Sequence, residues 1–168
     1  MPRALRWVAL FSGQGGQRTK YAQRLGTSLP DDLRTAWFDA LALAGVAAAS
    51  LDEATLIRNR VAQPTLCAWQ VDTWRTLATA LPPPALVAGY SVGELGACCA
   101  AGGFSDVQAI AFATLRAEFM DAATEPPAGL AAVLGLSARE VDTLCERAGT
   151  EVAIRNGVRH FVVGGPAS

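Results

Sequence analysis

The sequence predicts an α/β fold, and three observations support that prediction. Short apolar runs alternate with amphipathic stretches in the order strand, helices, strand, sharp turn, helix, which is typical of a layer with a mainly parallel sheet. After Glu125-Pro126-Pro127 the pattern changes to a strand, a helix and two short strands. An apolar content of 51% with only 17% charged residues is enough to bury a core. We therefore expect two parts, residues 1–125 and 126–168.

The first part alternates between strands and helices. Its expected elements are a strand at 7–11, a glycine-rich turn at 13–17, helices at 31–43 and 64–81, a buried strand at 85–88, and helices from about 92 and over 106–122. Pro64 suits a first helical turn, where its missing N–H would have no partner anyway. Ser50 and Glu53 have capping-box spacing ahead of a short helix, and Ser105 is expected to cap the last helix.

The second part resembles most of a split βαβ unit. It consists of a strand at 130–134, a helix opened by the capping box Ser137/Glu140, and short strands at 152–154 and 161–163. A complete ferredoxin-like unit needs one more helix and strand, which the chain does not supply before Ser168. We therefore expect an incomplete small subdomain.

Charge and terminal sequence exclude several functional classes. The 14 basic and 15 acidic residues give a formal charge of -1, and neither sign forms a block suited to nucleic acid or a membrane surface. The apolar run at 7–11 is too short for a signal peptide or a membrane span. A cytoplasmic protein is therefore expected.

The four cysteines form no C-x-x-C pair and have no nearby set of histidines. Neither a metal site nor a disulfide framework is predicted. Cys67, Cys98, Cys99 and Cys145 are interpreted as small core residues.

The segment Gly89-Tyr90-Ser91-Val92-Gly93 fits G-x-S-x-G, the nucleophile elbow. In this motif the serine lies on a strained turn between a strand and a helix, and both glycines allow close backbone approach. Backbone N–H groups and the positive helix end can stabilise an oxyanion there, with the Val92 amide as the first donor. The alternative is a glycine-bounded turn without chemistry.

Two motifs carry a resemblance to malonyl-CoA:acyl-carrier-protein transacylases. F-S-G-Q-G-G-Q at 11–17 resembles their F-P-G-Q-G-x-Q opening, and G-Y-S-V-G-E-L at 89–95 resembles their G-H-S-x-G-E. The Q-P, R-x-x-x-M and N-x(n)-V-x-G elements of that family match Gln63-Pro64, Arg116 with Met120, and Asn156. The resemblance implies an α/β-hydrolase-like large subdomain, here its N-terminal part at 1–125, with a ferredoxin-like small subdomain that is truncated at 126–168.

The resemblance implies ping-pong acyl transfer. Ser91 attacks the thioester of malonyl-CoA, CoA leaves, and the phosphopantetheine thiol of an acyl carrier protein takes the malonyl group. The backbone amides of Val92 and Gln14 hold the oxyanion. Malonyl-CoA is the substrate and no bound cofactor or metal is expected. The sequence requires nothing larger than a monomer.

Arg116 carries the substrate specificity in this interpretation. At helical spacing it shares a face with Phe112 and Met120, where a guanidinium needs a carboxylate partner. In the family the arginine pairs with the free carboxylate of malonate. The alternative is a structural arginine paired with a neighbouring Asp or Glu. Gln63 is expected to line the site, unless Gln-Pro only marks a helix start.

Two departures from the family concern the histidines. Tyr90 replaces the histidine before the nucleophile, and a tyrosine could keep a hydrogen-bond donor there in the substrate site. The family's general base lies in a P-x-H-x-x-L/M stretch that this sequence does not contain, so these 168 residues alone are expected to be nearly inactive. His160 does not match that motif and is interpreted as a surface or edge residue, and Glu94 as compensation of the helix dipole.

Other functions remain open. The elbow alone would also support a serine hydrolase or thioesterase, although Arg116 argues against it. An inactive module that binds a carrier protein is the second alternative. The sequence does not separate fatty-acid, polyketide and malonate decarboxylase systems.

Overall fold

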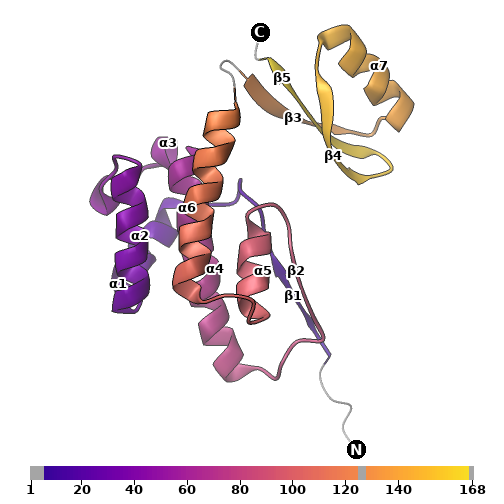
Figure 1. The fold of residues 1–168 in the computed structure, drawn as a ribbon. Helices are drawn as coiled ribbons and strands as arrows, with labels where there is room; N and C mark the ends of the chain where they lie inside the picture. The colour runs from indigo at the N-terminus through magenta and orange to yellow at the C-terminus, as the bar shows by residue number, and fades with distance from the viewer. Residues whose placement is uncertain (1–5, 125–127, 167–168) are drawn as a thin grey trace, which may run out of the picture. The chain divides into compact units, whose positions relative to one another are not determined.

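The chain divides into two compact units, Met1–Asp121 and Ala122–Ser168. The computed structural model describes residues 6–124 and 128–166 (Figure 1). Unit 1 combines a parallel strand pair with helices, and unit 2 combines an antiparallel sheet with one described helix. The predicted α/β class is therefore confirmed, while the α/β-hydrolase-like and ferredoxin-like descriptions stay predictions.

Unit 1 begins with a strand and continues through six α-helices and a second strand. Its elements are β1 (Val8–Phe11), α1 (Thr19–Ser28), α2 (Asp31–Leu43), the 3-10 turn η1 (Ala48–Ser50), α3 (Glu53–Leu56), α4 (Asn59–Ala80), β2 (Leu86–Gly89), α5 (Gly93–Ala100) and α6 (Asp106–Ala123). Helix α6 runs across the division between the units.

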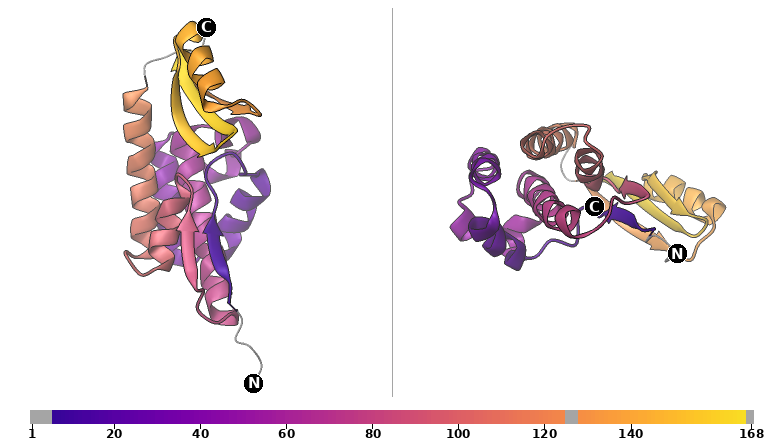
Figure 2. Two further views of the ribbon diagram at one scale, coloured as in Figure 1. Left: turned by 90° about the vertical axis from the view of Figure 1, so that its right-hand side faces the viewer. Right: turned by 90° about the horizontal axis from the view of Figure 1, so that it is seen from below.

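The strands β1 and β2 pair in parallel and lie side by side in Figure 2. One face carries Ala9 and Phe11, which are buried against Ala97 of α5. The opposite face is open, since Leu10 is 77% and Leu86 58% exposed. The expectation of a buried strand at 85–88 is therefore wrong, because only one face of this two-stranded sheet is covered within the described residues.

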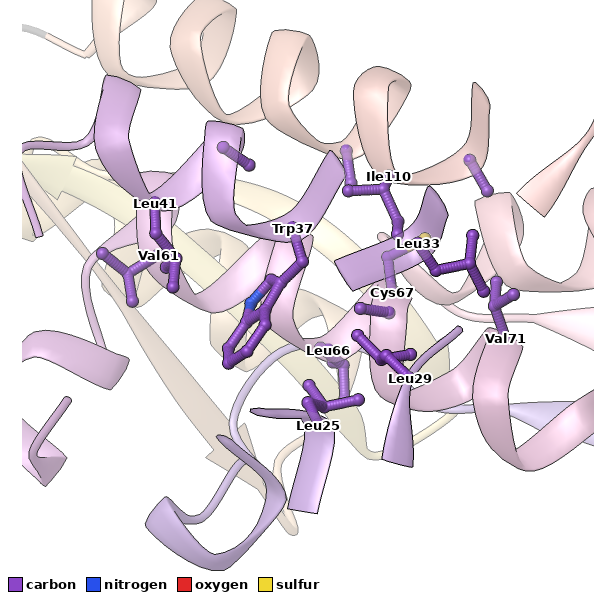
Figure 3. Close-up of a cluster of buried hydrophobic side chains, with 14 of the residues drawn as sticks. Leu25, Leu29, Leu33, Trp37, Leu41, Val61, Leu66, Cys67, Val71 and Ile110 are labelled. Carbon is purple, nitrogen blue, oxygen red and sulfur yellow. The ribbon is translucent and has the colours of Figure 1, made fainter. Parts of the chain in front are cut away.

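The core of unit 1 lies between the helices (Figure 3). Trp37 is fully buried, and its indole N–H donates a hydrogen bond of 3.0 Å to Thr65 Oγ1. Buried side chains around it come from α1, α2, α4 and α6, and from Leu29 between α1 and α2: Leu25, Leu29, Leu33, Leu41, Val61, Leu66, Cys67, Val71 and Ile110. This packing holds α6 against α4. It thereby fixes which faces of the two helices point towards α5.

Two predicted helix starts are wrong. Asp52, not Ser50, caps α3, since its carboxylate accepts from the Thr55 N–H at 2.7 Å, whereas the Ser50 hydroxyl donates to the Ala47 carbonyl. Asp52 thus forms a capping box with Thr55, two residues after the predicted Ser50. Pro64 lies inside α4 instead of in its first turn. Residues 61–68 are buried, and the helix extends upstream of the proline. The stabilisation from this packing outweighs the backbone hydrogen bond that a proline cannot donate.

Unit 2 contains β3 (Ala128–Leu134), α7 (Ala138–Ala148), β4 (Glu151–Gly157) and β5 (His160–Pro166). Its sheet is antiparallel in the order β3-β5-β4, and one face packs Phe161 against Val141 and Cys145 of α7. The capping box Ser137/Glu140 opens α7 as predicted.

The cysteine prediction holds at three of four positions. Cys67, Cys99 and Cys145 are buried, but Cys98 is exposed. Its helix α5 buries Gly96, Ala97 and Cys99 and turns Cys98 outward. Within the described ranges, no group of three His, Cys, Asp or Glu side chains could hold a metal ion, and no helix is long and apolar enough to cross a membrane.

Candidate functional site

Ser91 stands on the sharp turn between β2 and α5, with a backbone φ of 55°. It is the one non-glycine residue with positive φ among the described residues, a conformation that costs a serine energy. A side chain on Gly89 would meet the backbone of Gly93 and Glu94, and one on Gly93 would meet the Phe11 and Ser12 carbonyls. The turn thus has the geometry of a nucleophile elbow, which exposes the serine hydroxyl at a helix start.

The loop after β1 packs directly against this turn. A Cβ atom on Gly13 would lie 2.8 Å from Tyr90 Cδ1 and 3.3 Å from Ser91 Cβ. The Tyr90 N–H donates a hydrogen bond of 3.0 Å to the Phe11 carbonyl. The two motifs that the sequence analysis singled out are therefore in contact, although 70 or more residues separate them in the sequence.

Arg116 reaches Ser91 from α6. Its Nη2 donates a hydrogen bond of 3.1 Å to Ser91 Oγ, and its Nη1 donates to Gln63 Oε1 at 2.7 Å and to Met120 Sδ at 3.0 Å. Gln63 is 1% exposed, and its Nε2 donates to the same sulfur at 3.3 Å. The structure therefore brings together the predicted residues Ser91, Gln63 and Arg116, and adds Met120.

Among the residues that the structure describes, Arg116 has only neutral hydrogen-bond partners. Arg60, from the neighbouring helix, forms ion pairs with Glu118 and Asp121, and Arg75 pairs with Asp106. Among the described residues no carboxylate lies within ion-pair distance of Arg116. A half-buried guanidinium that has no counter-ion in the described part of the chain and lies beside a serine hydroxyl is suited to bind a substrate carboxylate.

The candidate oxyanion donors are the backbone N–H groups of Gln14 and Val92. Neither has an acceptor among the described residues. Val92 precedes the first residue of α5, where the positive end of the helix dipole favours a developing negative charge. The Gln14 side chain is used elsewhere, since its Nε2 donates to the Ile57 carbonyl at 3.2 Å.

Tyr90 lies at the rim of the turn with 45% of its surface exposed. It lines a shallow groove of about 310 Å³ together with residues of both strand ends, namely Leu10, Phe11, Ser12, Ala88 and Gly89. A ring at this position can contact a ligand that enters along the open face of the sheet.

Comparison with known proteins places these residues in a family. The family described as "Acyl transferase domain" matches residues 8–168. The chain belongs to the acyl transferase domain family. The match includes both units.

Relatives of this acyl transferase domain include two polyketide biosynthesis proteins. ThaF of Burkholderia thailandensis is 33% identical over 168 residues, covering 94% of this chain and 14% of ThaF. The polyketide biosynthesis malonyl CoA-acyl carrier protein transacylase BaeC of Bacillus velezensis is 29% identical, covering 93% of this chain and 55% of BaeC. The chain therefore spans about half the length of BaeC.

The fold agrees with solved acyltransferase structures. MCAT from Mycobacterium tuberculosis is 31% identical with a TM-score of 0.78, covering 96% of this chain and 56% of MCAT. The acyl transferase domain thus shares the α/β fold of these enzymes, with a parallel and an antiparallel sheet in the described residues.

Asn156 and His160 lie in unit 2 of the acyl transferase domain, where both are exposed. The Asn156 amide nitrogen is 3.5 Å from His160 Nε2. His160 begins β5 and is a surface residue, as predicted. The substrate-binding role of Asn156 stays a prediction. Glu94 is exposed in the first turn of α5, which agrees with dipole compensation.

Two glutamines hold the loop after β1 through hydrogen bonds and were not predicted as site residues. Gln70 of α4 donates from Nε2 to the Ser12 carbonyl at 2.6 Å, and Gln17 donates to the Leu56 carbonyl at 2.9 Å. Both glutamines are 8% exposed. Spacing offered a signal for Gln70, since it lies seven residues after Gln63 on the same helix face, in an otherwise apolar stretch.

Proposed function

We propose that this chain is the part of a malonyl-CoA:acyl-carrier-protein transacylase that carries the nucleophile. The observation that supports the proposal most directly is the hydrogen bond of 3.1 Å from Arg116 to Ser91 Oγ, made by an arginine without a carboxylate partner in the described part of the chain. Such an arginine favours an acyl group that ends in a carboxylate, because an uncharged acetyl group would leave its charge unpaired.

In the proposed reaction Ser91 Oγ adds to the thioester carbonyl of malonyl-CoA. The hydroxyl proton passes to a general base, and the amides of Gln14 and Val92 hold the oxyanion. The base then gives this proton to the CoA sulfur, so that CoA leaves as its thiol. The malonyl ester on Ser91 is then attacked by the phosphopantetheine thiol of an acyl carrier protein, which restores the serine hydroxyl. Tyr90, Gln63 and Asn156 are proposed to contact the substrate.

The general base is expected from the resemblance in a P-x-H-x-x-L/M stretch, which these 168 residues do not contain. The proposed reaction therefore belongs to a protein that supplies both parts. We propose a polyketide or fatty-acid carrier protein as the acceptor, since BaeC bears the name of a carrier-protein transacylase. We place the reaction in the cytoplasm.

Intact-mass measurement after exposure to malonyl-CoA tests the proposal on a protein that contains both this chain and the general base. The expected result is one added malonyl group on Ser91, located by peptide mapping, which a phosphopantetheine-bearing carrier protein then removes. The Ser91→Ala variant should gain no mass. Hydrolysis of the ester without transfer to the carrier protein would favour a thioesterase instead, and the lack of any label on Ser91 would refute the proposal.

A further inference from the structure

Two buried glutamine side chains hold the peptide groups on either side of the Gly13–Gln14 peptide. Gln70 Nε2 donates to the Ser12 carbonyl at 2.6 Å, and the Gly15 N–H donates to Gln17 Oε1 at 2.7 Å. The Ser12 carbonyl belongs to the peptide before Gly13, and the Gly15 N–H to the peptide after Gln14. The Gly13–Gln14 peptide, which carries the candidate oxyanion donor, therefore lies between two peptides that are both fixed.

The loop needs such external support because its sequence is flexible. Gly13, Gly15 and Gly16 have wide conformational freedom, and Gly15 adopts a φ of 120°. An oxyanion donor stabilises the transition state only when it is oriented before the reaction. Gly13 also contacts the Ser91 turn, so a rotation of this loop would displace the Gln14 N–H relative to Ser91 Oγ.

We infer that Gln70 is a positioning residue for the proposed reaction, which orients the Gln14 amide through the Ser12 carbonyl. The inference rests on the proposed function of Ser91.

The placement of the Gln70 amide group supports this role. Gln70 Oε1 is the one buried side-chain N or O atom without a hydrogen-bond partner in the described part of the chain. A Cβ atom on Gly96 would lie 2.8 Å from it, so the glycine makes room for this oxygen. A buried unpaired acceptor lowers stability, and a methionine of similar shape would avoid that cost. A residue retained only for stability would not be expected to carry it.

The test compares Gln70→Met with the wild type, both in a protein that contains this chain and the general base. The variant loses the donor but keeps the length of the side chain, so kcat for malonyl transfer should fall roughly ten- to a hundredfold, less than or similar to the loss of an oxyanion donor. The KM for malonyl-CoA should stay within about twofold, because Arg116 is untouched. Tm should change little, because the variant removes the unpaired Gln70 oxygen but leaves the Ser12 carbonyl without its donor. Amide hydrogen exchange should become faster in residues 13–16.

Two further variants make the outcome specific. Val71→Ala is the matched control for packing, because the neighbouring Val71 is 1% exposed and belongs to the hydrophobic core of unit 1. It should lower Tm and leave kcat unchanged. Gln70→Glu places an ionised acceptor against the Ser12 carbonyl at neutral pH. Its activity should recover as the pH falls, because the protonated carboxyl group can donate to that carbonyl, and burial raises its pKa.

The outcomes separate the two proposals. If the wild-type protein forms no malonyl ester on Ser91, the proposed function fails and the inference fails with it. If the wild-type protein is loaded, but Gln70→Met has the kcat of the wild type or loses activity only in proportion to its Tm, the inference about Gln70 alone is overturned.

Discussion

Arg116 Nη2 donates a hydrogen bond of 3.1 Å to Ser91 Oγ. Ser91 precedes α5, whereas Arg116 lies 25 residues later in α6. The same guanidinium donates to Gln63 and Met120. The group proposed to recognise the acyl group is thus in direct contact with the group proposed to carry it.

Replacement of Arg116 by alanine should change the choice of acyl group. We expect Arg116→Ala to lower malonyl loading roughly ten- to a hundredfold, as for the loss of a charge-assisted hydrogen bond, while acetyl loading stays similar or rises. Mass spectrometry of the protein after incubation with each acyl-CoA measures this ratio. Arg60→Ala, which breaks two ion pairs with the same helix, should leave the ratio unchanged. Equal loss of both activities would show that Arg116 is structural.

A carboxylate at position 63 should compete with the substrate. Gln63 Oε1 lies 2.7 Å from Arg116 Nη1, so Gln63→Glu would supply an internal partner for the guanidinium. The KM for malonyl-CoA should rise on the order of tenfold or more, with a smaller effect on acetyl-CoA. The neutral variant Gln63→Met serves as control. If both variants raise KM equally, Gln63 acts through its own hydrogen bonds and not through the charge of Arg116.

Two glycines in one loop should respond oppositely to the same substitution. Gly13→Ala would place a methyl group 3.0 Å from the Tyr90 carbonyl and 3.3 Å from Ser91 Cβ, so the loop must shift and kcat should fall on the order of a hundredfold. A Cβ atom on Gly16 meets nothing within 4 Å, and Gly16→Ala should retain activity. Steady-state kinetics distinguish the two. Full activity of Gly13→Ala would contradict the observed contact.

The cysteines should differ in reactivity. Burial raises the pKa of Cys67 to about 12, and burial with a hydrogen bond to Asp106 does the same for Cys99. Because the thiolate is the reactive form, iodoacetamide at pH 8 should modify the exposed Cys98 first and spare Cys67 and Cys99 until the protein unfolds. Peptide mass mapping over time gives the order. Early modification of Cys67 would argue against its burial.

Helix α7 should lose stability in acid. Hydrogen bonds from the Ser137 side chain and backbone hold the pKa of Glu140 below its ordinary value of 4.5. Since the folded-state pKa is depressed, the stabilisation is present above pH 4.5 and is lost as the pH falls through the lowered pKa. Ser137→Ala should therefore cost more stability at pH 7 than at pH 3, as measured by urea unfolding.

The matched control for this prediction is the start of α6. Ser105 pairs there with Gln108, which has no charge to lose. Ser105→Ala should cost the same stability at both pH values. An equal pH dependence of the two variants would show that Glu140 is not the titrating group.

The sequence predicted those features that depend on neighbouring residues. The elbow around Ser91 and the caps at Ser105 and Ser137 follow from local backbone geometry, and all three are present. Local rules also explain the error at Ser50, because Asp52 offers a second capping box close by. Sequence alone could not choose between them.

Features set by packing between distant segments were not predicted. The start of α4 before Pro64 depends on burial against other helices. The contact of Gln70 with Ser12 joins residues 58 positions apart, so no local pattern indicates it. Arg116 was identified through the resemblance, but its neutral surroundings became evident only when Gln63 and Met120 were seen beside it.

The absence of room around Gly89 and Gly93 has a consequence for engineering. Both positions face backbone atoms and no flexible side chain, so no neighbouring substitution can make space for a methyl group. Combinatorial libraries that aim to widen acyl-group preference should keep these two codons constant and place their diversity at Tyr90 and Gln63, where side chains already occupy the surroundings.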